Sequence, residues 1–189
     1  MAVKVVAYST LVLRILTLLL LAASAVYMFL NTYKIDGSKT SWKDLKTYRF
    51  VFATAVIGVF YLLIQIPFAV YYACTGKRLI RHSCLPEFDF YADKLVSYLL
   101  ASAVGAGIAA SMELKIIIDD VVALIAFIFE ALNSNVDLGI NLYEFKSKTD
   151  KFLDRGIIAT ILLAVGFGFM VVISILSSLN RPRSRNFFR

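Results

Sequence analysis

Three polar side chains interrupt long apolar stretches of this sequence: Arg14, Gln65 and Asp93. Within a membrane, such residues mark either a transport or proton-relay path or a polar clamp between helices. A guanidinium and a carboxylate suit a clamp, because they form charge-assisted hydrogen bonds. They do not suit acid–base catalysis, because arginine keeps its proton at neutral pH. One His and two Cys in the chain argue against a metal centre or a Cys/His active site, so we expect no enzyme activity and no cofactor.

The composition indicates which class of protein holds these residues. Of the 189 residues, 60% are hydrophobic and only 17% are charged, with a net charge of +7. Soluble domains contain ~45–50% apolar and ~25% charged residues. Such an excess of apolar surface could not be buried inside a water-soluble body of this size. The composition therefore argues against a soluble enzyme, a disordered tail and a secreted module held together by disulfides.

Four long apolar stretches predict the fold. They cover residues 5–30, 50–73, 90–112 and 156–179. A hydrocarbon core of ~30 Å requires ~20 mostly apolar residues as a helix, and in lipid the backbone must satisfy its own hydrogen bonds. The chain is therefore predicted to be an all-α membrane protein, a single domain of residues 1–189 built as a bundle of four transmembrane helices.

An even number of spans puts both ends of the chain on one side of the membrane. If that side is the cytosol, the inner segments are residues 1–4, 74–89 and 180–189. Lys and Arg are denser in these segments than in the outer ones, as the positive-inside rule requires. We therefore expect cytosolic termini and a cytosolic Arg-rich tail at 180–189, although the first outer loop is also basic.

Residues 114–132, LKIIIDDVVALIAFIFEAL, are nearly long enough for a fifth span. Asp119, Asp120 and Glu130 argue against one, because each mid-membrane Asp costs ~2.5–3.5 kcal/mol on insertion scales. The charged residues share a helical stripe with small ones, and the large apolar residues lie elsewhere around the helix. We therefore expect an amphipathic helix in the second extracellular loop, lying on the outer surface or capping the bundle. Residues 143–155 are expected to extend the last helix beyond the membrane.

Helical geometry relates the two intramembrane charges. Arg14 lies ~14 Å inside the first span and Asp93 ~5 Å inside the third, by the rise per residue of a helix. Both side chains tilt toward their helix N-termini, so Arg14 can reach the depth of Asp93. We expect a structural ion pair that fixes the first span against the third, because lipid supplies no hydrophobic drive for helix association. A transport site is the alternative, but only Gln65, near Pro67, resembles the broken polar helices of transporters.

Small residues provide a second packing signal. They recur at every fourth position in the third and fourth spans: Ser97, Ala101, Gly105 and Ala109, then Gly156, Thr160, Ala164 and Gly168. The third span carries a further set beside the first: Ala103, Gly107 and Ser111. Such ladders allow close approach of helices. They are candidates for packing inside the bundle or between copies of the chain.

Two further residues are candidates for a role at the membrane surface. Cys74 and Cys84 both fall in the short inner loop, so no disulfide is expected outside. Cys74 lies at a membrane edge, where lipidation is one interpretation and a reduced thiol at a helix end is the favoured one. Trp42, in the first outer loop, is either a contact for a partner or, as we favour, an interfacial anchor.

The spans together resemble the Casparian strip membrane domain protein-like family of plants, whose spans are similar to those of MARVEL-type tetraspans. The resemblance rests on Arg14 within LVLRILTLLLLAASAVYM, on YRFVFATAVIGVFYLLIQIPFAVYYA with its Tyr-Arg start and Gln65, and on Asp93 within FDFYADKLVSYLLASAVGAGIAAS. It implies a plasma-membrane protein with cytosolic termini that forms homo- and hetero-oligomers and acts as a scaffold. The stretch that the founding, strip-forming members share is not found in the outer loop NTYKIDGSKTSWKDLKTY, so strip formation is not implied.

The expected function is therefore a scaffold that organises a membrane domain or machinery associated with the cell wall. Its expected partners are itself, related tetraspans and the lipid bilayer, with no nucleic acid and no small-molecule substrate. A channel, a transporter or a transporter subunit that uses Arg14, Asp93 and Gln65 is the alternative. A membrane enzyme is disfavoured, because the sequence offers no nucleophile–base pair or His cluster.

Overall fold

The computed structural model describes residues 2–35, 38–75, 84–131 and 138–179. Four helices and one hairpin follow each other along the chain: α1 (Ala2–Phe29), β1 (Thr32–Ile35), β2 (Ser38–Ser41), α2 (Lys46–Thr75), α3 (Cys84–Ala131) and α4 (Leu138–Leu179). The predicted all-helical architecture is confirmed, apart from the two short antiparallel strands, which pair Thr32 with Ser41 and Ile35 with Ser38.

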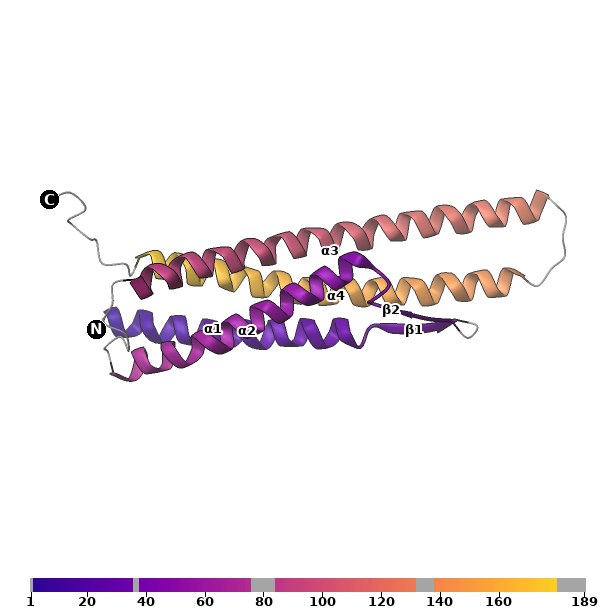
Figure 1. The fold of residues 1–189 in the computed structure, drawn as a ribbon. Helices are drawn as coiled ribbons and strands as arrows, with labels where there is room; N and C mark the ends of the chain where they lie inside the picture. The colour runs from indigo at the N-terminus through magenta and orange to yellow at the C-terminus, as the bar shows by residue number, and fades with distance from the viewer. Residues whose placement is uncertain (1, 36–37, 76–83, 132–137, 180–189) are drawn as a thin grey trace.

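The helices form an elongated bundle (Figure 1). α1 packs against both α2 and α4, α3 lies along α4, and α2 runs obliquely so that it also contacts α3. α1 begins and α4 ends at the same end of the bundle. Short connections between long helices favour this up-and-down arrangement.

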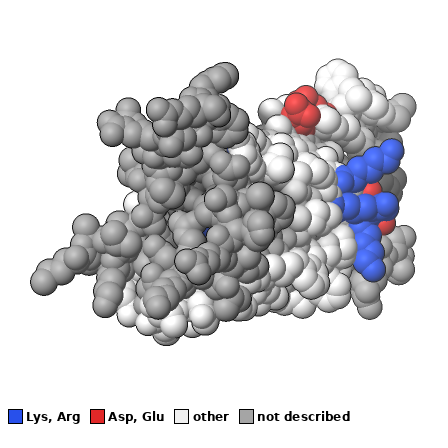
Figure 2. Space-filling model, turned by 60° about the vertical axis from the view of Figure 1, so that its left-hand side comes forward, with Lys and Arg blue, Asp and Glu red and all other residues white. Residues whose placement is uncertain are grey.

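Within the described residues, three helices are long and apolar enough to cross a membrane. The qualifying stretches are Tyr8–Phe29 in α1, Lys46–Tyr71 in α2 and Glu144–Ser178 in α4. In Figure 2 the described surface is uncharged along its middle, and Lys and Arg side chains gather at one end. An uncharged surface that ends at a charged zone is what a hydrocarbon layer requires of the protein that it surrounds.

The bundle core combines large apolar side chains with buried hydroxyl groups. Leu21, Leu62, Leu100 and Leu163 are fully buried, one from each helix. Ser24 donates a hydrogen bond of 2.7 Å to the backbone carbonyl of Ala159, which ties α1 to α4. Because lipid does not drive helices together, such close packing and interhelical bonds must hold the bundle.

The segment 114–131 corrects one prediction. No separate amphipathic helix lies on an outer surface there, because α3 continues without interruption from Cys84 to Ala131; residue 132 lies outside the described residues. Two of the charged residues in this segment, Lys115 and Asp119, instead pair with α4. Lys115 pairs with Asp154 at 2.5 Å, and Asp119 pairs with Lys146 at 2.8 Å. α4 begins at Leu138, so it includes residues 143–155, as expected, and runs beside this part of α3 (Figure 1).

The loop between α1 and α2 forms the hairpin of β1 and β2, and β1 packs on α4. Asn31 is buried. Its side-chain Nδ2 donates to the backbone carbonyl of Phe152 at 2.9 Å, and its backbone carbonyl accepts from the backbone N–H of Trp42 at 3.2 Å. The Tyr33 and Phe152 rings lie 5.1 Å apart. These contacts join the end of α1 to the hairpin and to α4.

Candidate functional site

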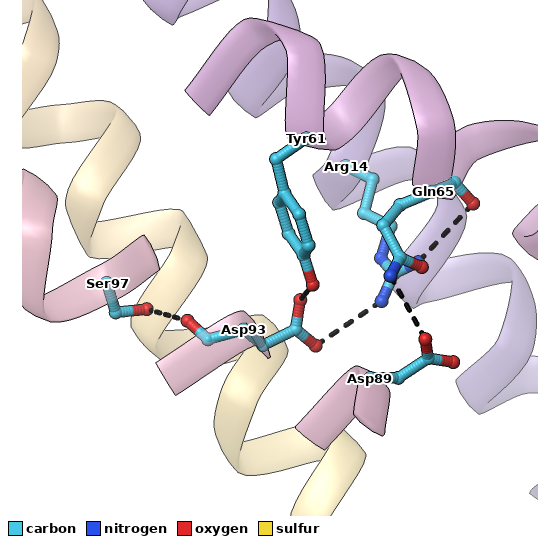
Figure 3. Close-up of polar contacts among 6 residues, drawn as sticks. All are labelled: Arg14, Tyr61, Gln65, Asp89, Asp93 and Ser97. Atoms are coloured by element: carbon cyan, nitrogen blue, oxygen red, sulfur yellow. Dashed lines mark hydrogen bonds and ion pairs between the residues drawn. The ribbon is translucent and has the colours of Figure 1, made fainter. Parts of the chain in front are cut away.

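Arg14 lies in the interior of the bundle, where only 6% of its surface is exposed. Its guanidinium points from α1 toward α2 and α3 (Figure 3). Nη1 donates to Oε1 of Gln65 at 2.8 Å, and Nη2 donates to Oδ2 of Asp93 at 3.3 Å. One side chain of α1 is thereby hydrogen bonded to both α2 and α3.

Asp93 is completely buried on α3, yet both of its carboxylate oxygens are hydrogen bonded. Oδ2 accepts from Arg14, and Oδ1 accepts from the Tyr61 hydroxyl of α2 at 2.5 Å. Ser97 donates to the backbone carbonyl of Asp93 at 2.7 Å. A buried carboxylate is tolerated when a cation and further donors satisfy its oxygens.

Gln65 extends the cluster toward the beginning of α3. Its Oε1 accepts from Arg14, and its Nε2 donates to Oδ1 of Asp89 at 3.0 Å. The hydrogen bonds therefore form one connected set from Tyr61 through Asp93, Arg14 and Gln65 to Asp89 (Figure 3). This set, with Ser97, is called the polar cluster below.

Two members of the polar cluster were missed in the sequence: Tyr61 and Asp89. Tyr61 lies four residues before Gln65, and Asp89 lies four residues before Asp93. Residues four apart share one face of a helix. This spacing could have identified both, once Gln65 and Asp93 had been placed on the interior faces of their helices.

The polar cluster can hold helices together, but it offers little for chemistry. Arg14 supplies a permanent positive charge, and the donors and acceptors point at each other rather than at an open space. Of its buried nitrogens, Nε of Arg14 has no partner among the described residues. Within the described ranges, no group of three or more His, Cys, Asp or Glu side chains could hold a metal ion.

The small-residue ladder of α3 does not lie on one face of the bundle. Ser97 is buried, Ala101 is intermediate, and Gly105 and Ala109 are exposed. A repeat of four residues drifts around a helix of 3.6 residues per turn, which explains the change. The neighbouring set does face inward: Ala103 and Ser111 are fully buried, and a Cβ added to Gly107 would lie 2.8 Å from Oγ1 of Thr160.

The ladder of α4 begins at a close contact with α2. Gly156 packs under the ring of Tyr48, which leaves no room for a Cβ. Thr160 is fully buried against α3, whereas Ala164 and Gly168 are only partly covered. The Tyr48 hydroxyl also lies 2.9 Å from Oγ of Ser111. The small residues Gly107, Gly156 and Thr160 therefore form the junction of α2, α3 and α4.

The structure also locates the two surface candidates. Cys74 is exposed, one residue before the end of α2. Trp42 is not an exposed contact: it is 8% exposed, and its ring centroid lies 4.5 Å from that of Phe52 and 6.2 Å from that of Phe29. The tail at 180–189 lies outside the described residues.

Comparisons with known proteins agree with the resemblance found in the spans. The family model described as the Casparian strip membrane protein domain matches residues 4–169. CASP-like protein 4D1 of Ricinus communis is 31% identical over 179 residues, which cover 93% of this chain and 92% of the relative. CASP-like protein 4D1 of Arabidopsis thaliana is 34% identical over 163 residues, which cover 84% and 79%. No solved structure matches the chain significantly.

Proposed function

Because the chain belongs to the family of the Casparian strip membrane protein domain, we propose that it is a tetraspan scaffold of the plasma membrane. It acts by assembling with copies of itself and with related family members, and so organises a membrane domain or machinery associated with the cell wall. The names of its relatives describe no catalytic activity, and the proposal includes none.

Four crossings with cytosolic termini fit the geometry best. The apolar part of α3, residues 95–112, is as long as a span requires. It packs along α4, which contains one of the three stretches that qualify as spans by length and composition. α1 begins and α4 ends at one end of the bundle, which is what an even number of crossings produces. The density of Lys and Arg in the inner segments supports the cytosol as the side of both ends.

The observation that carries the scaffold proposal is the closed set of bonds in the polar cluster. Arg14 and Asp93 bond to each other and to Gln65 and Tyr61, and so connect three of the four helices. A transport site would need polar groups that face a hydrated route. Groups that instead satisfy one another fix the helices in one arrangement, and a rigid body can present the same lateral surfaces to its neighbours.

The test is an exchange of the two charges. Arg14→Asp and Asp93→Arg are made singly and together, and assembly is measured by native gel size and by delivery to the cell surface. Each single change leaves a buried charge without its partner, at a cost of ~3–5 kcal/mol, so we expect loss of assembly. The double variant restores opposite charges and is expected to recover it.

Two results would contradict the proposal. The parent chain could run as a monomer in native membranes, which would remove assembly as the mechanism. Alternatively, the single variants could assemble normally while an ion or solute flux was lost, which would indicate transport. Lys94→Asp is the matched control, because Lys94 adjoins Asp93 but contacts the ring of Phe90, with its Nζ 4.2 Å from the ring centroid.

A further inference from the structure

The outer part of α3 carries an apolar face that the described residues leave uncovered. Ser111 contacts Tyr48 in the first turn of α2, so the residues that follow Ser111 extend beyond α2 (Figure 1). On this extension six large side chains are between 43% and 68% exposed: Ile116, Ile117, Val121, Leu124, Phe127 and Ile128. The opposite side is used by α4, to which Lys115 and Asp119 are paired.

Lipid is a poor cover for this face. The same stretch of helix carries exposed Asp119, Asp120 and Glu130, whose charges belong in water. In water, six such side chains form a patch on the order of 600 Å², at the upper end of what soluble monomers expose. A face of this size marks a contact with another protein.

The spacing within the face indicates a helix as the partner. Ile117, Val121, Leu124 and Ile128 are separated by four, three and four residues, which is the spacing of a coiled-coil seam. Val121 and Ile128 occupy one of the two alternating positions, and Ile117 and Leu124 occupy the other. β-Branched residues at the first position with leucine at the second favour two parallel helices, and three of these four residues follow that rule. These four residues are called the outer seam.

A second copy of the chain satisfies these conditions. α3 is unbroken from Cys84 to Ala131, so the outer seam is held upright at a fixed distance from the polar cluster. Two copies inserted in the same direction present their seams parallel and at equal height around a twofold axis along the membrane normal. In that register Asp120 faces the position of Ile125 in the other copy, so no like charges oppose each other.

We propose that two copies of this chain pair through the outer seam, outside the lipid. The proposal rests on the proposed function, because it specifies where the copies that form the scaffold meet. It differs from pairing through the small residues Gly105 and Ala109, which lie within the apolar part of α3.

Disulfide trapping in membranes tests the outer seam. The full chain with Cys74→Ser and Cys84→Ser receives one new cysteine, as Val121→Cys, Leu124→Cys or Ile128→Cys. Ala123→Cys and Ala126→Cys are matched controls, because both alanines are exposed on the same turns of α3 but lie outside the seam. Two differently tagged copies are co-expressed, so a trapped dimer is identified by both tags. We expect roughly tenfold more mixed dimer at the seam than at the controls, because only facing Cβ atoms come within disulfide reach.

Three results would overturn the outer seam. Equal yields at the seam and control positions would place the contact elsewhere. Trapping of a different protein instead of the second tag would make the partner heterologous. Failure of a membrane-impermeant maleimide to label the control variants Ala123→Cys and Ala126→Cys, which lie on the same turns but outside the seam, would place this part of α3 in lipid. If the parent still runs as an oligomer on native gels, these results leave the scaffold proposal intact, whereas a monomeric parent overturns both proposals.

Discussion

The guanidinium of Arg14 and the carboxylate of Asp93 lie 3.3 Å apart, although 79 residues separate them in the chain. Burying two charges costs several kcal/mol per ion, and their attraction offsets that cost only when other bonds satisfy the remaining polar atoms. Gln65 and Tyr61 supply such bonds. The ion pair therefore adds little net stability. Its main effect is to select one arrangement of α1, α2 and α3, because any other arrangement would leave a charge unpaired in the apolar interior.

Tyr61→Phe tests the contribution of the neutral members. The change removes one donor from the Asp93 carboxylate and keeps the ring, so we expect the free energy of unfolding to fall by ~1.5–3 kcal/mol, as for a hydrogen bond to a charged group. Thermal unfolding in detergent measures it. Tyr98→Phe is the control, because Tyr98 is 69% exposed on α3. This change should leave the free energy of unfolding almost unaltered. Equal effects of the two changes would show that the hydroxyl of Tyr61 contributes nothing to the cluster.

Two glycines of α3 lie on different sides of the helix: Gly107 faces the interior of the bundle and Gly105 faces outward. At Gly107 an added Cβ would lie 2.8 Å from Oγ1 of Thr160 and 3.0 Å from Cγ2 of Val51, whereas at Gly105 it would meet nothing within 4 Å. Gly107→Ala is expected to destabilise the chain by ~1–3 kcal/mol through overpacking. Gly105→Ala should be neutral or stabilising by up to ~1 kcal/mol, because alanine favours helix. The free energies of unfolding of the two variants are compared in the same detergent. If Gly105→Ala were the more destabilising change, α3 would be rotated from the orientation described.

The sequence predicted the helical class, because apolar stretches of span length have few other folds in lipid. It also indicated that Arg14 and Asp93 could meet, because helical rise fixes their depths. It did not predict the hairpin of β1 and β2, because the second strand, SKTS, has no apolar residue and the packing of the first depends on Phe152 far along the chain.

The end of α3 was mispredicted for a similar reason. The charges of residues 114–132 were interpreted as the sign of a separate amphipathic helix that lies on the outer surface or caps the bundle, because a sequence does not show that Lys115 and Asp119 find partners on α4. With those partners the helix continues as one side of a hairpin. The small residues of α3 also pass from a buried position at Ser97 to an exposed one at Ala109. This change depends on which face of α3 meets α4, and the spacing of the residues alone does not determine that face.

Trp42 gives a fluorescence signal for the loop between α1 and α2. It is the single Trp of the chain and is buried between aromatic rings, so its fluorescence should be blue-shifted and weakly quenched by iodide. Trp42→Ala is expected to cost ~3–5 kcal/mol, as for other buried aromatic truncations. Phe60→Ala, at a side chain 62% exposed on α2, is the control and should cost far less in detergent. Strong quenching of the parent by iodide would contradict the packed hairpin.

The ion pairs between the outer parts of α3 and α4 should contribute little and should not respond to pH near neutrality. Lys115 donates to Asp154, and this hydrogen bond raises the pKa of Lys115 above its ordinary 10.5. A raised pKa means that protonated Lys115 contributes its full stabilisation throughout the neutral range, below 10.5, and loses it as the pH rises through the higher, folded-state value.

Both side chains are partly exposed, so solvent screens the pair, and Lys115→Ala is expected to cost less than ~1 kcal/mol. Unfolding measured between pH 6 and pH 9 should show the same small difference between parent and variant throughout, and 1 M salt should reduce that difference. A difference that grew as the pH fell from 9 to 6 would contradict this assignment. It would mean that a group with a pKa in that range, rather than this lysine, governs the contact of the two helices.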